Sequence, residues 1–247
     1  MSDHRSSSDC ESRSSDHEEY PSLNSDFSMP GTVKQPANIL VTGFGPFDHH
    51  EINASWEAVK ELATLGVPCD SKLITREIPV LYDHVNHHIP DIWRSIDPKV
   101  VVHVGVSGDA NEVTIETCAH NLGYDRLDVS GSTTPLQCYK TDGTDCIHTG
   151  LDAQRICQDV NESSCLAMAT VSSDAGRYLC EYIYYASLCE DSTRVVFVHV
   201  PPLNSPYTAK ELGHALQVVI VSMLKQLGLY HPLPLSNDEL STLQQQK

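Results

Sequence analysis

The chain has 247 residues, of which 40% are hydrophobic and 20% charged, a balance that allows most of it to build a packed core. The 33 Asp and Glu against 16 Lys and Arg leave a formal net charge of −17. This acidic balance argues against nucleic acid and anionic membranes as partners, because both attract basic surfaces. No apolar run approaches the roughly 18 residues of a membrane-spanning helix, and the N-terminus lacks the apolar segment of a signal peptide. We therefore expect a soluble, cytoplasmic protein.

The two ends of the chain differ in composition from its middle. Residues 1–36 are rich in Ser, Asp and Glu and poor in aliphatic side chains, so they cannot bury enough apolar surface to offset the entropy of ordering. We expect a disordered acidic tail there, one domain over residues 37–230, and a loose C-terminal tail over residues 231–247.

Within residues 37–230, short apolar runs alternate with helical periodicities. The first strand is predicted over residues 38–42, and Asn53 is predicted to cap the helix that follows it. A strand over 73–80 and a helix over 82–96 come next, the helix with a break or a late start at Pro90. The continuous apolar run over 99–106 is typical of a central parallel strand that is covered on both faces.

The second half of the domain continues this alternation. Strands are predicted over 112–119, 166–171 and 194–200, and helices over 151–160, 178–188 and 209–227. The pattern predicts an α/β fold, a three-layer α/β/α sandwich around a mostly parallel sheet. Ligand sites in such sheets lie at the carboxyl ends of the strands, so the residues that follow Thr42, Val106, Val171 and Val200 are the places to search.

The cysteines and histidines show no spacing typical of metal ligands. The nine cysteines are an odd number, are scattered along the chain and include no CxxC pair, so we treat them as free thiols rather than as a disulfide framework. The histidine doublets at 49–50 and 87–88 lack any HExxH-like spacing. The sequence therefore predicts no metal site and no cofactor.

Two glycine-containing segments each follow a predicted strand. The segment 43–47 reads Gly-Phe-Gly-Pro-Phe, and it lacks the third glycine of a dinucleotide-binding fingerprint. Its side chains Phe44 and Phe47 either plug the core or line an apolar pocket for a flat group. The second segment, 105–108, contains Val106 between glycines and is either a tight turn or a place where a ligand approaches the backbone.

A thiol, an imidazole and a carboxylate lie where they can form a catalytic group. The predicted helix after Gly176 places Cys180 in its first turn, where the unpaired N–H groups and the helix dipole favour a thiolate. His199 lies at the carboxyl end of the strand 194–200 and can exchange protons with such a thiol. Glu116 is a candidate to orient that imidazole. The alternative for Cys180 is a small buried hydrophobe, and His103, within the strand 99–106, is expected to be a core residue.

Six motifs together resemble one known family. They are TGFGPF at 42–47, NASWEAV at 53–59, VVHVGVSG at 101–108, HNLGY at 120–124, DAGRYLC at 174–180 and FVHVPP at 197–202. In this order the motifs are similar to those of the pyroglutamyl-peptidase I family, peptidase family C15, in its animal form. The resemblance covers residues 39 to 224, nearly the whole predicted domain.

The resemblance implies a fold, an activity and roles for individual residues. It implies a cytoplasmic cysteine exopeptidase (an omega peptidase) on an α/β/α sandwich, which hydrolyses the bond after an N-terminal pyroglutamyl residue and needs no cofactor. Position by position, Cys180 is the nucleophile, His199 the general base and acid, and Glu116 the orienting carboxylate. Phe44 and Phe47 match the phenylalanines that bind the lactam ring, and the backbone around Val106 matches the segment that binds its amide.

Some residues depart from the family pattern and leave alternatives open. Ser173 stands where a glutamine is expected, Ala119 where a glycine is expected, and residues 125–145 match poorly. The alternatives are a catalytically silent binding protein on the same fold, a cysteine hydrolase of another small cyclic amide, and a nucleotide-binding domain. The expected partners are small pyroglutamyl-blocked peptides, with neither nucleic acid nor membrane. The sequence does not fix the oligomeric state, for which a monomer is the favoured expectation.

Overall fold

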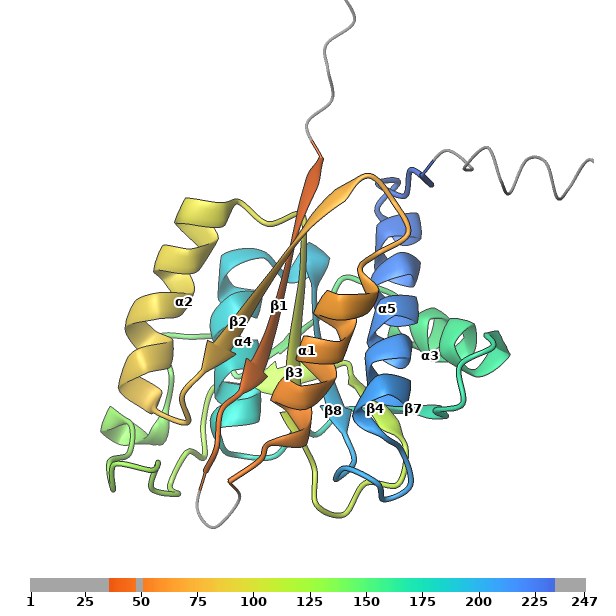
Figure 1. The fold of residues 1–247 in the computed structure, drawn as a ribbon. Helices are drawn as coiled ribbons and strands as arrows, with labels where there is room; N and C mark the ends of the chain where they lie inside the picture. The colour runs from red at the N-terminus through yellow and green to blue at the C-terminus, as the bar shows by residue number, and fades with distance from the viewer. Residues whose placement is uncertain (1–35, 48–50, 234–247) are drawn as a thin grey trace, which may run out of the picture. The chain divides into compact units, whose positions relative to one another are not determined.

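The computed structural model describes residues 36–47 and 51–233 (Figure 1). The predicted acidic tail lies outside the described residues apart from Pro36, and so does the predicted C-terminal tail beyond Leu233. The first residues of that C-terminal segment pair with the body of the fold. The carbonyl of His231 accepts a hydrogen bond of 2.9 Å from the Asp70 amide, and Pro232 forms a β-bridge with Cys69.

A six-stranded sheet in the order β2-β1-β3-β8-β4-β7 forms the centre of the fold. All neighbouring strands pair in parallel except β4 and β8, which are antiparallel. The prediction of a mostly parallel sheet is therefore confirmed. The strands are β1 (Ala37–Phe44), β2 (Ser71–Ile78), β3 (Val100–Val106), β4 (Val113–Glu116), β7 (Ala169–Ser172) and β8 (Val195–Val200).

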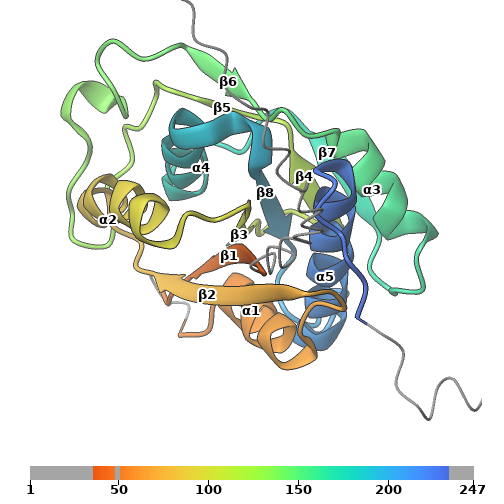
Figure 2. The same cartoon turned by 90° about the horizontal axis from the view of Figure 1, so that it is seen from above.

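Helices cover both faces of this sheet, as Figures 1 and 2 show. Side chains of β3 such as Val101 and Val102 alternate between the two hydrophobic clusters under these layers, which explains why the central strands read as continuous apolar runs. The three-layer sandwich predicted from the sequence is confirmed. One layer contains α1 (Ala54–Leu65), α3 (Ala153–Glu162) and α5 (Ala209–Gln226), and the other contains α2 (Tyr82–Ile96) and α4 (Leu179–Asp191).

The strand predicted over residues 112–119 is two strands in two different sheets. It divides at Thr117, whose amide donates a hydrogen bond of 2.8 Å to the Ser172 carbonyl. Beyond this point, β5 (Cys118–His120) leaves the main sheet and pairs antiparallel with β6 (Cys146–His148). The sequence did not predict this two-stranded ribbon, nor the short helices η1 (Pro135–Gln137) and η2 (Ser192–Arg194).

One further expectation from the sequence is wrong. The helix α2 runs without a break through Pro90, because one lost backbone hydrogen bond is outweighed by the burial of Val85, Ile89 and Trp93 on the same face. Ser172, which follows Val171, lines one cavity with residues that follow Val106 and Val200, as the sequence predicts, although β7 does not share the direction of their strands. Since β7 is parallel to β4 and β4 is antiparallel to β8, β7 runs in the opposite direction.

The buried polar side chains of the central strands have partners. His103 is fully buried, and its two ring nitrogens lie 2.7 Å from the hydroxyls of Thr42 and Ser187. Burial lowers the pKa of His103 to about 3, so this imidazole is neutral at physiological pH. The expectation that His103 is a core residue is confirmed.

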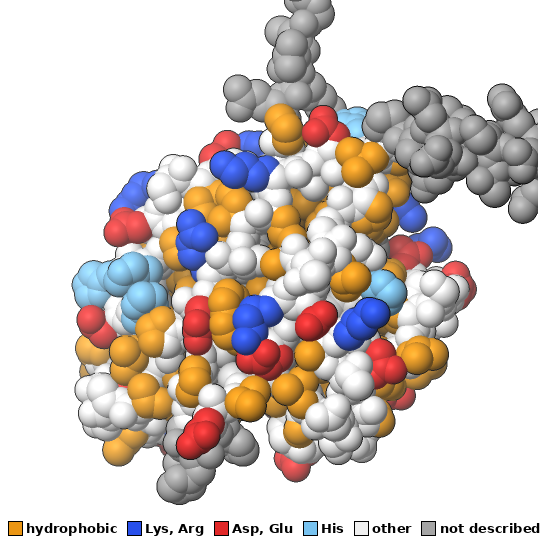
Figure 3. Space-filling view, in the orientation of Figure 1, with side chains coloured by type: hydrophobic (Ala, Val, Ile, Leu, Met, Phe, Trp, Pro, Cys, Tyr) orange, Lys and Arg blue, Asp and Glu red, His pale blue; other side chains and the backbone are white. Residues whose placement is uncertain are grey.

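None of the described helices combines the length and the apolar character that crossing a bilayer requires. On the face shown in Figure 3, Lys and Arg side chains lie singly among acidic and apolar ones. The described residues on that face therefore present no continuous basic patch.

The contact between β1 and α1 depends on Gly43. A Cβ atom at this position would lie 2.9 Å from the Ser55 carbonyl oxygen and 2.9 Å from the Cα atom of Trp56. We expect Gly43→Ala to lower the free energy of unfolding by about 1–3 kcal/mol, because helix backbone cannot move aside as a flexible side chain can. Urea denaturation measures this change. The matched control is Gly108→Ala, where a Cβ atom meets nothing within 4 Å, and an equal loss of stability in both variants would contradict the argument.

Candidate active site

All six site residues predicted from the sequence line one cavity of about 990 Å³. The cavity lies where the carboxyl ends of β1, β3 and β8 meet the beginning of α4. The structure thus brings together side chains from widely separated parts of the chain. These residues are Phe44, Phe47, Val106, Glu116, Cys180 and His199.

Cys180 lies in the first turn of α4, as predicted. Gly176 adopts φ +84°, and the helix begins at Leu179 after an extended Tyr178. The side chain of Tyr178 does not cap the helix, because its hydroxyl donates a hydrogen bond of 3.1 Å to the Leu127 carbonyl. The N–H groups of the first turn therefore have no side-chain acceptor from the N-cap residue, and Cys180 lies at the positive end of the helix dipole.

The thiol of Cys180 rests on the backbone of the central strand β3. A Cβ atom on Gly105 would lie 2.7 Å from the Cys180 Sγ atom and 2.7 Å from the Phe197 ring. Any side chain at position 105 would displace the sulfur. Gly105, near the end of β3, is therefore explained by the close approach of the Cys180 sulfur and not by a tight turn.

His199 and Glu116 form a buried pair across the one antiparallel contact of the sheet. The His199 Nδ1 atom lies 2.8 Å from the Glu116 Oε1 atom, and the two residues are 8% and 2% exposed. In the strand register Glu116 is opposite Phe197, so its carboxylate reaches diagonally to His199 on the same face. The hydroxyl of Tyr184 donates a hydrogen bond of 3.0 Å to the Glu116 carbonyl and fixes that backbone.

The surroundings of His199 favour its charged form. Burial lowers the pKa of His199, but the hydrogen bond and the charge of Cys180, together with those of Glu116, raise it overall, to about 10. An imidazolium is therefore present at neutral pH and is lost only as the pH rises toward 10. A positive charge beside the thiol favours the thiolate, and the carboxylate behind the imidazole stabilises that charge.

The phenylalanine loop is held in place by the start of α1. Phe44 donates its backbone N–H to the Ser55 hydroxyl at 3.0 Å, and the Asn53 amide donates to the Gly45 carbonyl at 2.9 Å. Asn53 also caps α1 by accepting a hydrogen bond from the Ser55 amide, so the predicted cap is confirmed. The sequence did not reveal that the same two residues also support the loop that carries Phe44 and Phe47.

The segment that matched the family pattern poorly also reaches the cavity. Arg126 lines it, with its guanidinium carbon 4.4 Å from the centre of the Tyr178 ring. Asp128 accepts hydrogen bonds from the amides of Tyr82, Ser130 and Ser132, and these bonds order the following turn. No motif marks Arg126, so only the fold could identify it as a residue of the cavity wall.

A thiol, an imidazole and a buried carboxylate facing one cavity form the arrangement of a cysteine hydrolase. The fold and the site together define this class.

Comparisons with known proteins narrow the class to a family. The family model described as pyroglutamyl peptidase matches residues 37–224. The human protein "Pyroglutamyl-peptidase 1" is 46% identical over 196 residues, which are 79% of this chain and 94% of that protein. The "Pyrrolidone-carboxylate peptidase" of Brachyspira hyodysenteriae is 30% identical over 200 residues, 75% of this chain and 98% of that protein. The chain therefore belongs to the pyroglutamyl peptidase family.

The fold is shared with solved structures of distant sequence. The crystal structure of pyroglutamyl peptidase I from Bacillus amyloliquefaciens matches with a TM-score of 0.69 at 24% identity, covering 76% of this chain and 97% of that one. The pyrrolidone carboxyl peptidase from Thermococcus litoralis matches with a TM-score of 0.68 at 18% identity, covering 81% and 99%. At this level of identity the likeness concerns the fold alone.

The charged state of His199 predicts an unusual pH dependence for alkylation of Cys180. Between pH 6.5 and 8.5 we expect the iodoacetamide rate at Cys180 to stay nearly constant, because His199, whose pKa is raised to about 10, keeps a positive charge beside the sulfur throughout this range. In His199→Asn the rate should rise about five- to tenfold per pH unit, as for an ordinary thiol with a pKa of about 8.5. Peptide mass spectrometry separates the Cys180 product from the others.

The exposed Cys189 is an internal control in both proteins. Although the residue is exposed, partial desolvation of its sulfur raises the pKa of Cys189, so its alkylation should rise with pH in the wild type as well as in the variant. A rise of about five- to tenfold per pH unit at Cys180 in the wild type would contradict the proposed ion pair.

Proposed function

We propose that this protein removes the N-terminal pyroglutamyl residue from peptides by hydrolysing the bond that follows it. The observation that carries the proposal is the hydrogen bond of 2.8 Å between His199 and Glu116 beside the Cys180 thiol, in a cavity lined by Phe44 and Phe47. Membership of the pyroglutamyl peptidase family supports the choice of substrate.

In the proposed mechanism the Cys180 thiolate attacks the carbonyl carbon of the pyroglutamyl residue. A C–S bond forms, and the carbonyl electrons move to oxygen to give a tetrahedral intermediate. The N–H of Cys180, in the first turn of α4, is placed to donate to this oxyanion. As the intermediate collapses, the C–N bond breaks and the His199 imidazolium gives its proton to the departing amine.

Water then completes the reaction. His199, now neutral, takes a proton from a water molecule, and the resulting hydroxide attacks the thioester carbonyl. The second tetrahedral intermediate releases pyroglutamate and returns the thiolate and imidazolium. Glu116 stabilises the imidazolium through the 2.8 Å hydrogen bond to His199 Nδ1.

Recognition of a pyroglutamyl residue suits an apolar pocket with few charges. The lactam ring carries no charged amine, so binding depends on burial of the ring and on hydrogen bonds to its amide. In this proposal Phe44 and Phe47 supply the apolar surface, and the backbone around Val106 bonds the amide. Since the Ser107 amide already donates to the Val200 carbonyl at 3.0 Å, the backbone of Val106 itself is the better partner.

The organisation of the chain and its location are part of the same proposal. We place the catalytic domain at residues 37–230, flanked by an acidic N-terminal tail and a short C-terminal tail, and acting as a monomer. The described cysteines are all free, which favours the reducing environment of the cytoplasm.

The direct test is cleavage of a pyroglutamyl-coumarin amide by the purified protein under reducing conditions. Cys180→Ser should lower kcat/KM by at least about 10³-fold, because an alcohol supplies far less nucleophile than the thiolate. The matched control Cys189→Ser alters an exposed thiol outside the cavity and should leave the rate unchanged. No release by the folded, reduced wild-type protein would refute the proposed activity.

The role of Glu116 has its own test. Glu116→Gln should lower kcat by about 10²–10⁴-fold, since a neutral amide cannot stabilise the imidazolium. The Glu116 Oε2 atom is buried without a hydrogen-bond partner within the described residues, so loss of the charge should not lower the melting temperature. Glu112→Gln alters an exposed carboxylate on the same segment and is the matched control. An unchanged rate in Glu116→Gln would mean that another group orients His199.

A further inference from the structure

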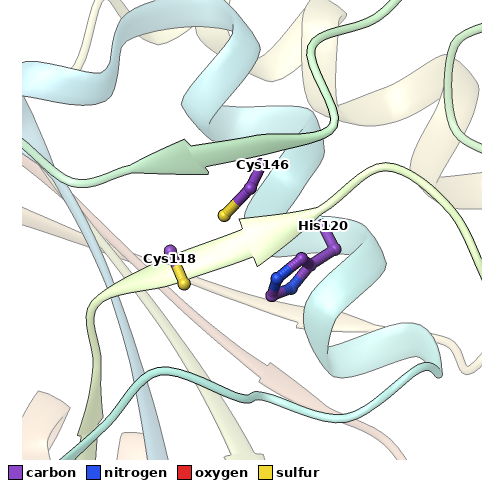
Figure 4. A group of neighbouring side chains, drawn as sticks. All are labelled: Cys118, His120 and Cys146. Carbon is purple, nitrogen blue, oxygen red and sulfur yellow. The ribbon is translucent and has the colours of Figure 1, made fainter.

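A second group of reactive side chains lies outside the cavity, on the ribbon of β5 and β6. Its members are Cys118, His120 and Cys146, whose ligand atoms all lie within 4.8 Å of one another (Figure 4). None of the three lines the cavity of Cys180 and His199. Within the part of the chain that the structure describes, this is the one group of His, Cys, Asp and Glu side chains close enough to hold a metal ion.

The strand register explains why these side chains meet. Both strands carry the pattern Cys-x-His, at 118–120 and 146–148, so each strand presents its cysteine and histidine on one face. His120 is directly opposite Cys146, and Cys118 is directly opposite His148. Directly opposite residues share a face, so all four side chains lie on the same face of the ribbon.

His148 completes the set at its exposed end. Its Nε2 atom lies 3.9 Å from the Cys146 sulfur. Cys118 is buried, and His120 and Cys146 are half-buried. The group therefore has one buried ligand, Cys118, and an exposed side at His148 through which an ion can enter from solvent.

A buried carboxylate orients His120 for metal binding. The Nδ1 atom of His120 lies 2.8 Å from the Oε1 atom of Glu181, which has no exposed side-chain surface. Arg177 contacts both oxygens of this carboxylate at 3.0 and 2.9 Å, so Glu181 accepts and His120 Nδ1–H donates. The Nε2 atom of His120 is then the deprotonated nitrogen that can bind a metal, as in carboxylate–histidine–zinc arrangements.

The dimensions fit a tetrahedral ion. Zinc bonds of about 2.3 Å to sulfur and 2.0–2.1 Å to nitrogen place tetrahedral ligands about 3.5–3.8 Å apart. The separations among Cys118, His120 and Cys146, all within 4.8 Å, need to close by roughly 1.3 Å at most. Two thiols and two imidazoles form a ligand set that zinc prefers and that magnesium and calcium do not.

We propose that Cys118, His120 and Cys146, with His148 as the fourth ligand, form a zinc site that fastens the β5–β6 ribbon. Strands of three residues each make a weak ribbon by themselves. The ion would hold together the two ends of the segment 121–145, which reaches the cavity at Arg126. The site does not use the Cys180 thiol, so it is independent of the proposed peptidase activity.

The test uses the full chain carrying Cys180→Ser, which prevents metal binding at the other reactive thiol. After removal of metal in a phosphine reductant, the protein is titrated with Co²⁺ and then with Zn²⁺. We expect one Co²⁺ per chain, with thiolate-to-cobalt charge-transfer absorption and the intense visible bands of a tetrahedral ion, and displacement of Co²⁺ by Zn²⁺. Zn²⁺ should also raise the melting temperature, since it binds the folded chain.

Variants in the Cys180→Ser background assign the ligands. Cys146→Ser should lower the Co²⁺ affinity by more than about 100-fold, and His148→Asn by about tenfold or more. Cys189→Ser removes an exposed thiol elsewhere and should leave spectrum and affinity unchanged. Cys146 is half-buried, so its replacement by serine should be tolerated, and circular dichroism checks this.

The proposal is overturned if Co²⁺ gives no thiolate charge transfer, or if Cys146→Ser binds it as tightly as the Cys180→Ser parent. It is equally overturned if Cys118 and Cys146 form a disulfide under the same reducing conditions and exclude the metal. An unchanged affinity in His148→Asn alone would remove His148 from the ligand set.

Discussion

The site depends on one antiparallel contact within an otherwise parallel sheet. If β4 ran in the same direction as β8, the last residue of β4 would not lie opposite Phe197, and the carboxylate of Glu116 would not reach His199. Because β4 is antiparallel and short, its last residue, Glu116, lies opposite Phe197. Its carboxylate reaches the imidazole two residues further along β8. The reversal of strand direction thus supplies the third member of the Cys–His–Glu group.

The same contact explains how a buried charge is tolerated. Glu116 is almost fully buried, and one of its oxygens has no partner within the described residues, so a charged imidazole is its main compensation. His199 needs that carboxylate in return, since burial alone would make the imidazole neutral. The carboxylate therefore helps to keep His199 charged, and a charged imidazole beside Cys180 favours the thiolate.

Local patterns predicted the elements of the fold, and they did so because apolar runs and helical spacing are properties of neighbouring residues. The sequence placed the strand that ends at His199 and the helix that begins near Cys180 within one or two residues. Strand direction and pairing are long-range properties. The reversed direction of β4 and β7, the division at Thr117 and the ribbon of β5 and β6 were therefore not predicted.

Some features of the sites were visible in the sequence only in part. The six site residues predicted from the sequence came from strand ends, a helix start and a family resemblance, and the structure brings all six together. Arg126 has no local signal. The group around Cys118 does have a local signal, because the pattern Cys-x-His occurs twice. A search for CxxC pairs and histidine doublets does not detect this pattern. Only the register of the ribbon shows that the two copies face each other.

The absence of a side chain at Gly105 has a stereochemical consequence. The backbone of β3 at Gly105 covers one side of the Cys180 sulfur, and the Phe197 ring also lies next to Gly105. The sulfur can therefore meet an electrophile only from the cavity, along one line of approach. Under the proposed mechanism every substrate would present the same face of its carbonyl to the thiolate, and each tetrahedral intermediate would form with a single handedness.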